Sequence, residues 1–166
     1  MIRIIVCTDR NGLFAYNGVS LKPPPNDLKR FKRLTQGHAV VMGRLTWESL
    51  PVKPLPDRVN VVVSASDNCY ADNDLSDNFD AYSVADAIEG INYRWPDKHV
   101  YIIGGQHIYN EALPLADQIA RTVINDIVPE DVILNNPRYF KIPEKGWKLT
   151  SVEKHDNYDF EVWERC

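Results

Sequence analysis

Two stretches of this sequence join an apolar run, a glycine and a helical pattern without a break. Residues 38–43 (HAVVMG) lead directly into 44–50 (RLTWESL), and residues 99–105 (HVYIIGG) lead directly into 106–113 (QHIYNEAL). An apolar strand followed by a helix is the unit of parallel sheets, because the helix carries the chain back across the sheet. A chain with two such units is therefore expected to fold as helices packed on a mostly parallel sheet.

The other apolar patterns continue this alternation of strands and helices. Strands are predicted at 2–7, 59–64 and 118–126, and helices at 25–35 and 84–95. Ser83 precedes the second of these helices and is suited to cap it.

The C-terminal part of the chain has a different pattern. Residues 147–156 and 158–165 alternate strictly about Asn157, which predicts an antiparallel hairpin. Residues 66–80 are acidic and turn-rich, which predicts a loop within the domain. The sequence thus predicts one α/β domain over residues 1–166. It has a mostly parallel central sheet of about eight strands with an antiparallel C-terminal hairpin, flanked by about four helices.

Composition excludes several classes of function. The 166 residues are 44% hydrophobic and carry a net charge of −4, which argues against nucleic acid or an anionic membrane as the main partner. Cys7, Cys69 and Cys166 are odd in number and widely spaced, which predicts neither a metal site nor a disulfide framework. A reducing compartment, the cytoplasm, is expected. The start of the chain is predicted to be a strand rather than a signal peptide, and no apolar run is long enough to span a membrane.

The two strand–glycine–helix turns are the first candidates for a ligand site. Gly104 and Gly105 allow close approach of a ligand to the backbone, and a helix start offers free N–H groups to phosphate. Arg44 and Thr46 follow Gly43 at the other turn, where a guanidinium is well placed for a phosphate. Each turn alone is equally consistent with a tight connection and a surface charge. Two in one small domain favour a ligand with several phosphates.

Asp27 is the second candidate. It lies in the first turn of the helix predicted at 25–35, where the helix dipole alone favours an acid. It also lies one turn before Phe31, on the apolar side with Leu28. A buried carboxylate needs a partner or has a raised pKa, which is how enzymes make a proton donor. The basic residues at 29–33 are interpreted as a solvated face.

Six sequence motifs in order resemble the dihydrofolate reductase family over nearly the whole chain. They are NGLFAYNG (11–18), NDLKRFK (26–32), VVMGRLTWESL (40–50), LPDRVNVVVS (55–64), VYIIGGQHIYNEALPLAD (100–117) and FEVWER (160–165). The resemblance implies the dihydrofolate reductase fold and reduction of 7,8-dihydrofolate to tetrahydrofolate with NADPH, for one-carbon metabolism and thymidylate synthesis. It also implies inhibition by antifolates and a monomeric protein.

The resemblance implies roles for individual residues. Asp27 would bind the pterin and promote protonation of N5, supported by Thr122, and Tyr109 would flank the nicotinamide. The remaining substrate-binding residues it implies are Ile5, Val6, Cys7, Leu28, Phe31, Leu50, Leu55, Arg58 and Ile103. Arg58 would bind the glutamate carboxylate of the substrate, a task that suits a bidentate guanidinium.

The cofactor site is implied in the same way. Gly104 and Gly105 would form a cis peptide beside NADPH, and Arg44, Thr46 and His107 would hold its phosphates. The full set implied for cofactor binding is Cys7, Ala15, Gly43, Arg44, Leu45, Thr46, Ser64, Ala65, Ile103, Gly104, Gly105, Gln106, His107, Ile108 and Tyr109. No residue is implied to bind a metal.

The sequence departs from the family pattern near the acid. Leu21 and Lys22 stand where the family has Pro-Trp, Ala15 replaces a loop glycine, and His107 stands where some relatives have arginine. Lys22 either points to solvent or lies near Asp27 when the loop closes, where its charge would lower the pKa of that carboxyl. The second possibility adds Lys22 to the candidate catalytic residues.

Two alternative functions stay open at this point. One is a pyrimidine reductase of the riboflavin pathway, which shares the fold, although Asp27 and Arg58 argue against it. The other is a folate- and NADPH-binding protein with weak or no turnover, supported by the missing tryptophan. Consumption of NADPH with dihydrofolate separates these readings.

Overall fold

A computed structural model describes residues 1–65, 77–126 and 134–166 of the chain. The helices within these residues are α1 (Pro25–Thr35), α2 (Arg44–Ser49), α3 (Val84–Arg94) and α4 (Gln106–Ala112). The strands are β1 (Ile2–Asp9), β2 (Leu13–Tyr16), β3 (Val19–Ser20), β4 (Ala39–Gly43), β5 (Val59–Val63), β6 (Phe79–Ala81), β7 (Val100–Ile102), β8 (Gln118–Ile124), β9 (Arg138–Tyr139), β10 (Trp147–Lys154) and β11 (Tyr158–Arg165).

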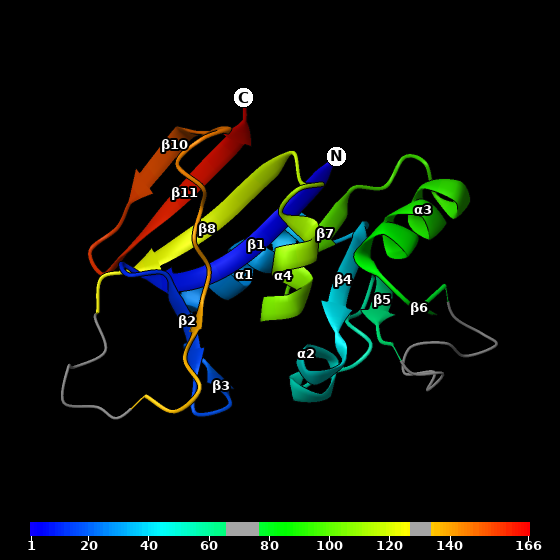
Figure 1. Ribbon diagram of the computed structural model, residues 1–166, viewed down its shortest axis with the longest axis horizontal. Helices are drawn as coiled ribbons and strands as arrows, with labels where there is room; N and C mark the ends of the chain where they lie inside the picture. The colour runs from blue at the N-terminus through cyan, green and yellow to red at the C-terminus, as the bar shows by residue number, and fades with distance from the viewer. Residues whose placement is uncertain (66–76, 127–133) are drawn as a thin grey trace.

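An eight-stranded sheet in the order β10-β11-β8-β1-β7-β4-β5-β6 forms the centre of the molecule (Figure 1). The six strands from β8 to β6 pair in parallel, while β11 pairs antiparallel with β8, and β10 antiparallel with β11. This confirms the predicted α/β architecture with an antiparallel C-terminal hairpin.

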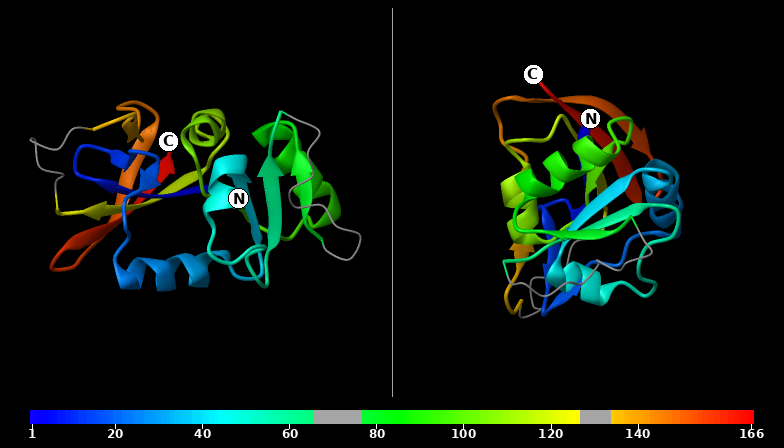
Figure 2. Two further views of the ribbon diagram at one scale, coloured as in Figure 1. Left: turned by 90° about the horizontal axis from the view of Figure 1, so that it is seen from below. Right: turned by 90° about the vertical axis from the view of Figure 1, so that its right-hand side faces the viewer.

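The helices cover both faces of the sheet, with α1 on one face and α3 and α4 on the other (Figure 2). The larger apolar cluster lies on the α3 and α4 side and includes Ile4, Val41 and Ile102. The smaller cluster lies on the α1 side and includes Val40, Met42 and Tyr101. Side chains alternate between the two clusters along each strand, because successive residues of a strand point to opposite faces.

Local sequence determines the helix starts. Pro25 occupies the first position of α1, where its missing N–H has no intrahelical partner to lose. The Ser83 side chain accepts a hydrogen bond of 3.1 Å from the Asp86 backbone N–H at the start of α3. This confirms the predicted N-cap.

Most element boundaries agree with the prediction within two residues, and the differences lie in short strands. Phe79 and Asp80 belong to β6, so the end of the predicted loop 66–80 is instead a strand at the sheet edge. Residues 66–76 of that loop, with Cys69, lie outside the described residues. A second sheet in the order β3-β2-β9 was not predicted. Within the described parts of the chain, no helix has the length and apolar character needed to cross a membrane.

Candidate active site

The two glycine turns contact each other at the ends of β4 and β7. The Gly43 backbone N–H donates a hydrogen bond of 2.8 Å to the Gly104 carbonyl. The Gly104–Gly105 peptide is cis, and Gly104 has a φ of +121°. A Cβ atom at Gly104 would lie 3.2 Å from the Tyr109 hydroxyl and 3.5 Å from Thr46 Oγ1. Glycine therefore allows the chain to pass closely between Thr46 of α2 and Tyr109 of α4.

Tyr109 connects this turn to the first strand. Its hydroxyl donates a hydrogen bond of 2.9 Å to the Ile5 carbonyl of β1. Its ring meets Phe14 edge-on at 5.4 Å between centroids. Burial raises the pKa of the Tyr109 hydroxyl, so the group stays a neutral donor. Tyr109 thus fixes α4 against β1.

Asp27 lies in the first turn of α1 with only 9% of its surface exposed. The Thr122 hydroxyl donates a short hydrogen bond to Asp27 Oδ1. Burial raises the pKa of the Asp27 carboxyl, while the Thr122 hydrogen bond and the positive charge of Arg30 act in the opposite direction. Asp27 is therefore an acid with a partner on the sheet and a shifted protonation equilibrium, as the sequence predicts.

Cys7 lies beside this acid, paired with Thr122 in the register of β1 and β8. Burial, and secondarily the Asp27 charge, raises the pKa of the Cys7 thiol to about 12. The thiol is protonated at neutral pH and cannot act as a nucleophile. Its position suits a packing role against a ligand at Asp27.

Apolar side chains surround the space between α1 and the sheet. Ile5, Leu50, Leu55 and Ile103 are partly buried and pack against the smaller cluster. In contrast, 58% of Leu28 is exposed. An exposed leucine beside a buried carboxylate is suited to contact an apolar ring held by that acid.

Arg58 is held in place at the end of the same helix. Its Nη1 donates to Thr35 Oγ1 at 3.0 Å, and its Nε donates to the Pro56 carbonyl at 2.8 Å. Its guanidinium lies 5.9 Å from the centroid of the Phe31 ring. These contacts orient a cation at the rim of the apolar space.

Arg44 and His107, both predicted to hold cofactor phosphates, are each paired with an acid one turn further along their helix. Arg44 Nη1 lies 3.4 Å from Glu48 Oε1, and His107 Nε2 lies 2.8 Å from Glu111 Oε1. Glu111 also accepts a hydrogen bond from the Val84 backbone N–H. Leu45, next to Arg44, is 71% exposed. The starts of α2 and α4 therefore present an arginine and a histidine at the surface near the Gly43–Gly104 contact.

Three of the predicted residues lie less favourably. The Val6 side chain belongs to the larger cluster on the opposite face, so Val6 can meet a ligand only through its backbone. Ala15 pairs with Ser20 in the small sheet. Lys22 is exposed, and the cation that acts on Asp27 is Arg30.

The remaining predicted cofactor residues border the glycine turns. Ser64 and Ala65 follow β5. Gln106 Oε1 accepts a hydrogen bond of 3.1 Å from the Tyr139 backbone N–H, and Ile108 is buried in the larger cluster.

Arg30 is the residue near the acid that sequence reasoning missed. The run at 29–33 was interpreted as solvated, but the Arg30 guanidinium lies 4.3 Å from the centroid of the Phe160 ring of β11. The helical spacing offered a signal, because Arg30 comes three residues after Asp27 and thus shares its side of α1.

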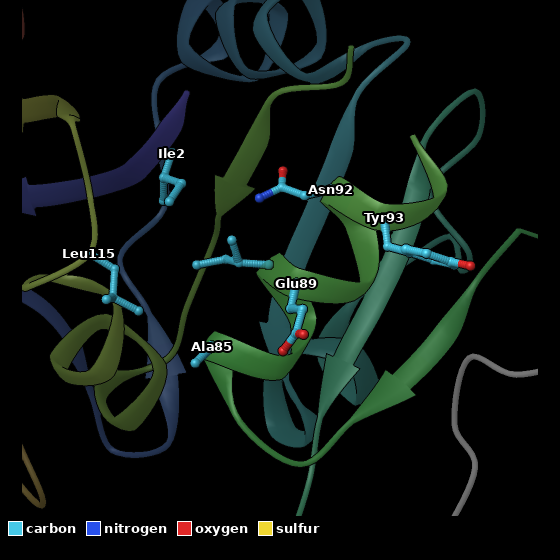
Figure 3. A pocket seen from close by; sticks show the side chains of 7 residues that line it. Ile2, Ala85, Glu89, Asn92, Tyr93 and Leu115 are labelled. Carbon is cyan, nitrogen blue, oxygen red and sulfur yellow. The ribbon is translucent and has the colours of Figure 1, made fainter. Parts of the chain in front are cut away.

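A groove of about 550 Å³ lies away from these residues, between α3 and the start of β1 (Figure 3). Ile2, Ile88, Tyr93 and Leu115 are among the side chains that line it. It is on the α3 face of the sheet, whereas Asp27 is on the α1 face. The groove is therefore separate from the candidate active site.

The fold and the site together define an α/β protein with a buried, hydrogen-bonded acid under α1 and two glycine turns in contact at the ends of β4 and β7. The family model described as dihydrofolate reductase matches residues 1–165. The chain belongs to the dihydrofolate reductase family.

Curated relatives agree with this assignment. The chain is 34% identical to the dihydrofolate reductase of Bacillus subtilis (strain 168), over 97% of this chain and 91% of the relative. It is 32% identical to that of Buchnera aphidicola subsp. Acyrthosiphon pisum, over 99% of both chains. A region covering 60% of the chain is 44% identical to 56% of the dihydrofolate reductase of Staphylococcus aureus (strain Mu50).

Proposed function

We propose that this protein reduces 7,8-dihydrofolate to 5,6,7,8-tetrahydrofolate with NADPH, as an oxidoreductase of its family. The observation that carries the proposal is the buried Asp27 carboxyl with its Thr122 hydrogen bond. A single acid among apolar walls can bind a heterocycle with adjacent N–H donors and help one proton to reach it. The product would supply one-carbon metabolism and thymidylate synthesis.

In this proposal Asp27 accepts hydrogen bonds from the ring nitrogen and the amino group of the pterin. The Thr122 hydroxyl orients the carboxyl through the bond it already makes. The acid then promotes protonation of the neighbouring N5 through water. Its raised pKa brings its protonation equilibrium nearer to neutral pH than that of an exposed aspartate.

The apolar and cationic residues at the rim suit the rest of the substrate. Leu28, Phe31, Leu50 and Leu55 would pack on the benzoyl ring. Arg58 would bind the glutamate carboxylate, since its contacts with Thr35 and Pro56 already fix its direction.

The nicotinamide cofactor of this family supplies the hydride that reaches pterin C6. The glycine turns fit such a group, because a Cβ at Gly104 would crowd Tyr109 and Thr46. We propose that the cofactor is NADPH. Arg44, Thr46 and His107 would hold its phosphates, and the Ile103 carbonyl would accept from its amide.

A single chain can carry the complete site, so the proposal needs no second copy. We therefore propose a monomer that forms one domain over residues 1–166. Cys7 and Cys166 are free thiols, which suits a reducing compartment such as the cytoplasm. Antifolates would compete for the Asp27 site, because they present the same pattern of donors.

The site favours this activity over the two alternatives. The substrate of a pyrimidine reductase of the riboflavin pathway has no glutamate tail, so that activity gives no role to the oriented Arg58. A binding protein without turnover requires a defect at the acid, yet Asp27 and Thr122 are joined. Leu21 and Lys22 stand where the family has Pro-Trp, and Asp27 keeps its place in the first turn of α1.

The test is loss of NADPH absorbance on addition of dihydrofolate, and its block by an antifolate. Asp27→Asn and Arg58→Ala are assayed beside the wild type. We expect turnover in the wild type, a large loss of rate in the first variant and mainly weaker substrate binding in the second. A wild-type protein that binds both ligands without turnover would establish the binding-protein alternative.

A further inference from the structure

Arg30 is a charged residue that the proposed reaction does not use. It lies on α1 three residues after Asp27, so both side chains project from neighbouring positions on one side of the helix. Arg30 is only partly exposed, unlike Lys29 and Arg33. A half-buried guanidinium one turn from a buried carboxylate requires an explanation.

Contacts from β11 fix Arg30 in this position. Its guanidinium stacks on the Phe160 ring at 4.3 Å. Phe160 pairs with Thr122 in the register of β11 and β8. Thr122 in turn donates its hydrogen bond to Asp27. Arg30 thus contacts Phe160, and Asp27 contacts Thr122, and these two contacted residues are paired in the sheet.

A second contact holds the start of the helix on the same strand. Asn26 Nδ2 donates to the Tyr158 hydroxyl at 2.9 Å. Together with the stacking of Arg30 on Phe160, this hydrogen bond fixes the first turns of α1 against β11. Arg30 is therefore held on β11 in the folded structure, one helical turn from Asp27.

Among the described residues, the other polar groups linked to Asp27 by a hydrogen bond or by its charge carry no positive charge. The Thr122 hydroxyl of β8 is neutral, and burial raises the pKa of both the Cys7 thiol of β1 and the Tyr109 hydroxyl of α4. Arg30 lowers the pKa of Asp27, and burial raises it. Thr122, Cys7 and Tyr109 belong to three different elements, and Arg30 shares α1 with Asp27.

Arg30 itself is subject to further charges. Burial lowers the pKa of Arg30, Asp27 and Glu153 of β10 act in the opposite direction, and Arg3 of β1 and Arg33 of α1 lower it further. A guanidinium remains charged under all these influences at neutral pH, because its ordinary pKa is very high.

We propose that Arg30 is a positioning residue for Asp27, whose guanidinium, seated on Phe160, offsets the burial of that carboxylate. This deepens the proposed function and rests on it, since it assigns the electrostatic control of the proposed proton-handling acid. Lys22, the cation suggested by the sequence, is exposed. Arg30 takes the electrostatic role that the sequence suggested for Lys22.

The first test needs no catalysis. The carboxyl resonance of Asp27 is followed against pH in ¹³C-aspartate-labelled protein and assigned by its absence in Asp27→Asn. Arg30→Met keeps an apolar stem and removes the charge. We expect it to raise the titration midpoint of Asp27 by roughly one unit, a tenfold change in the protonation equilibrium.

Three matched variants separate charge from structure. Arg33→Met removes the same charge one turn further along α1, from an exposed position, and should leave the midpoint at the wild-type value. Arg30→Lys keeps the positive charge, so the titration midpoint of Asp27 should stay close to the wild-type value. Arg30→Gln replaces Arg30→Met if the latter does not fold. An unchanged midpoint in Arg30→Met or Arg30→Gln, or an equal shift in Arg33→Met, would overturn the proposal.

The second test links the shift to the reaction. The falling limb of the pH profile of single-turnover hydride transfer should move to higher pH in Arg30→Met by the same amount as the resonance. A shifted resonance with an unshifted limb would show that Arg30 controls Asp27 but that Asp27 does not set the rate, which contradicts the proposed function alone. An unshifted resonance would contradict the Arg30 proposal alone.

Discussion

Burial has opposing consequences for Asp27. It provides the apolar environment that a heterocycle requires, and it raises the pKa of the acid. Thr122 and Arg30 favour the charged form and so limit that rise. The pKa of Asp27 therefore depends on its burial, on the Thr122 hydroxyl and on the Arg30 guanidinium.

Replacing this acid should impair the chemical step. We expect Asp27→Asn to slow hydride transfer by about 10²–10⁴-fold near neutral pH, the usual contribution of general acid–base catalysis. The rate should recover as the pH falls, when more substrate is already protonated at N5. Single-turnover rates from pH 5 to 9 measure this, with NADPH affinity as the control for an intact fold. A wild-type rate at neutral pH in the variant would contradict the role of Asp27.

Cofactor preference depends on Arg44 in our proposal. Arg44→Ala should weaken the binding of NADPH by about 1.5–3 kcal/mol, the usual loss for a hydrogen bond to a charged group. The binding of NADH should weaken much less. Glu48→Gln releases Arg44 from its 3.4 Å ion pair and should strengthen NADPH binding by about 0.2–1 kcal/mol, because exposed pairs are weak. Dissociation constants for both cofactors measure this. Equal losses for NADPH and NADH in Arg44→Ala would assign Arg44 to the shared pyrophosphate instead.

At the scale of the elements, strong local signals were predictable. Helix α1 begins at Pro25 and ends at Thr35 as predicted, because the proline fixes the start and Gly37 follows the end. Strand β6 has three residues beside an acidic run, and pairing with Val61–Val63 of β5 creates it. Such a strand depends on a partner far along the chain, so its own sequence gives little indication of it.

The same distinction applies to the candidate site. Asp27, Gly43 and Gly104 were predictable, because their positions relative to helices and strands carry the signal. The contact of Arg30 with Phe160 joins α1 to β11, more than one hundred residues later in the chain, and no spacing predicts it. The exposure of Lys22 likewise depends on the path of the loop before α1, which the sequence pattern does not predict.

The glycine turn between β7 and α4 gives a prediction at this scale. Gly104→Ala should reduce cofactor affinity at least tenfold, because its Cβ would lie 3.2 Å from the Tyr109 hydroxyl in the space kept for the ligand. Gly18→Ala is the control, since Gly18 also has a positive φ but no atom within 4 Å of a Cβ there. Gly18→Ala should cost about 1–2 kcal/mol of stability for its left-handed backbone, and Gly104→Ala more, because a φ of +121° lies outside the left-handed region that other residues adopt. Cofactor titration and urea unfolding separate the two effects, and equal affinities in both variants would contradict the crowding argument.

At the scale of the whole molecule, the sheet separates two apolar clusters of unequal size. The larger one, under α3 and α4, contains Tyr109, whereas the smaller one lies on the same face as α1 and the acid. The site thus lies on the side with fewer buried apolar contacts. A carboxylate buried there is expected to reduce the stability of the folded protein, because its charged form loses hydration.

The free energy of unfolding should therefore report the protonation of Asp27. An unfolded chain loses this proton near the ordinary value of 3.8, whereas the folded protein holds it to higher pH because burial raises the pKa. Since the folded state binds more protons in that interval, the contribution of Asp27 to stability falls as the pH rises through it and stays lower above it. Asp27→Asn removes this dependence, and its amide oxygen can still accept from Thr122.

We thus expect Asp27→Asn to be more favourable to stability at pH 8 than at pH 4, relative to the wild type. Urea unfolding of both proteins at a series of pH values, at constant ionic strength, measures the difference. Asp97→Asn, which removes one charge from an exposed position, is the control for the change in net charge. A difference between Asp27→Asn and the wild type that is constant with pH would contradict the prediction, because it would mean that Thr122 and Arg30 fully offset the effect of burial on the pKa of Asp27.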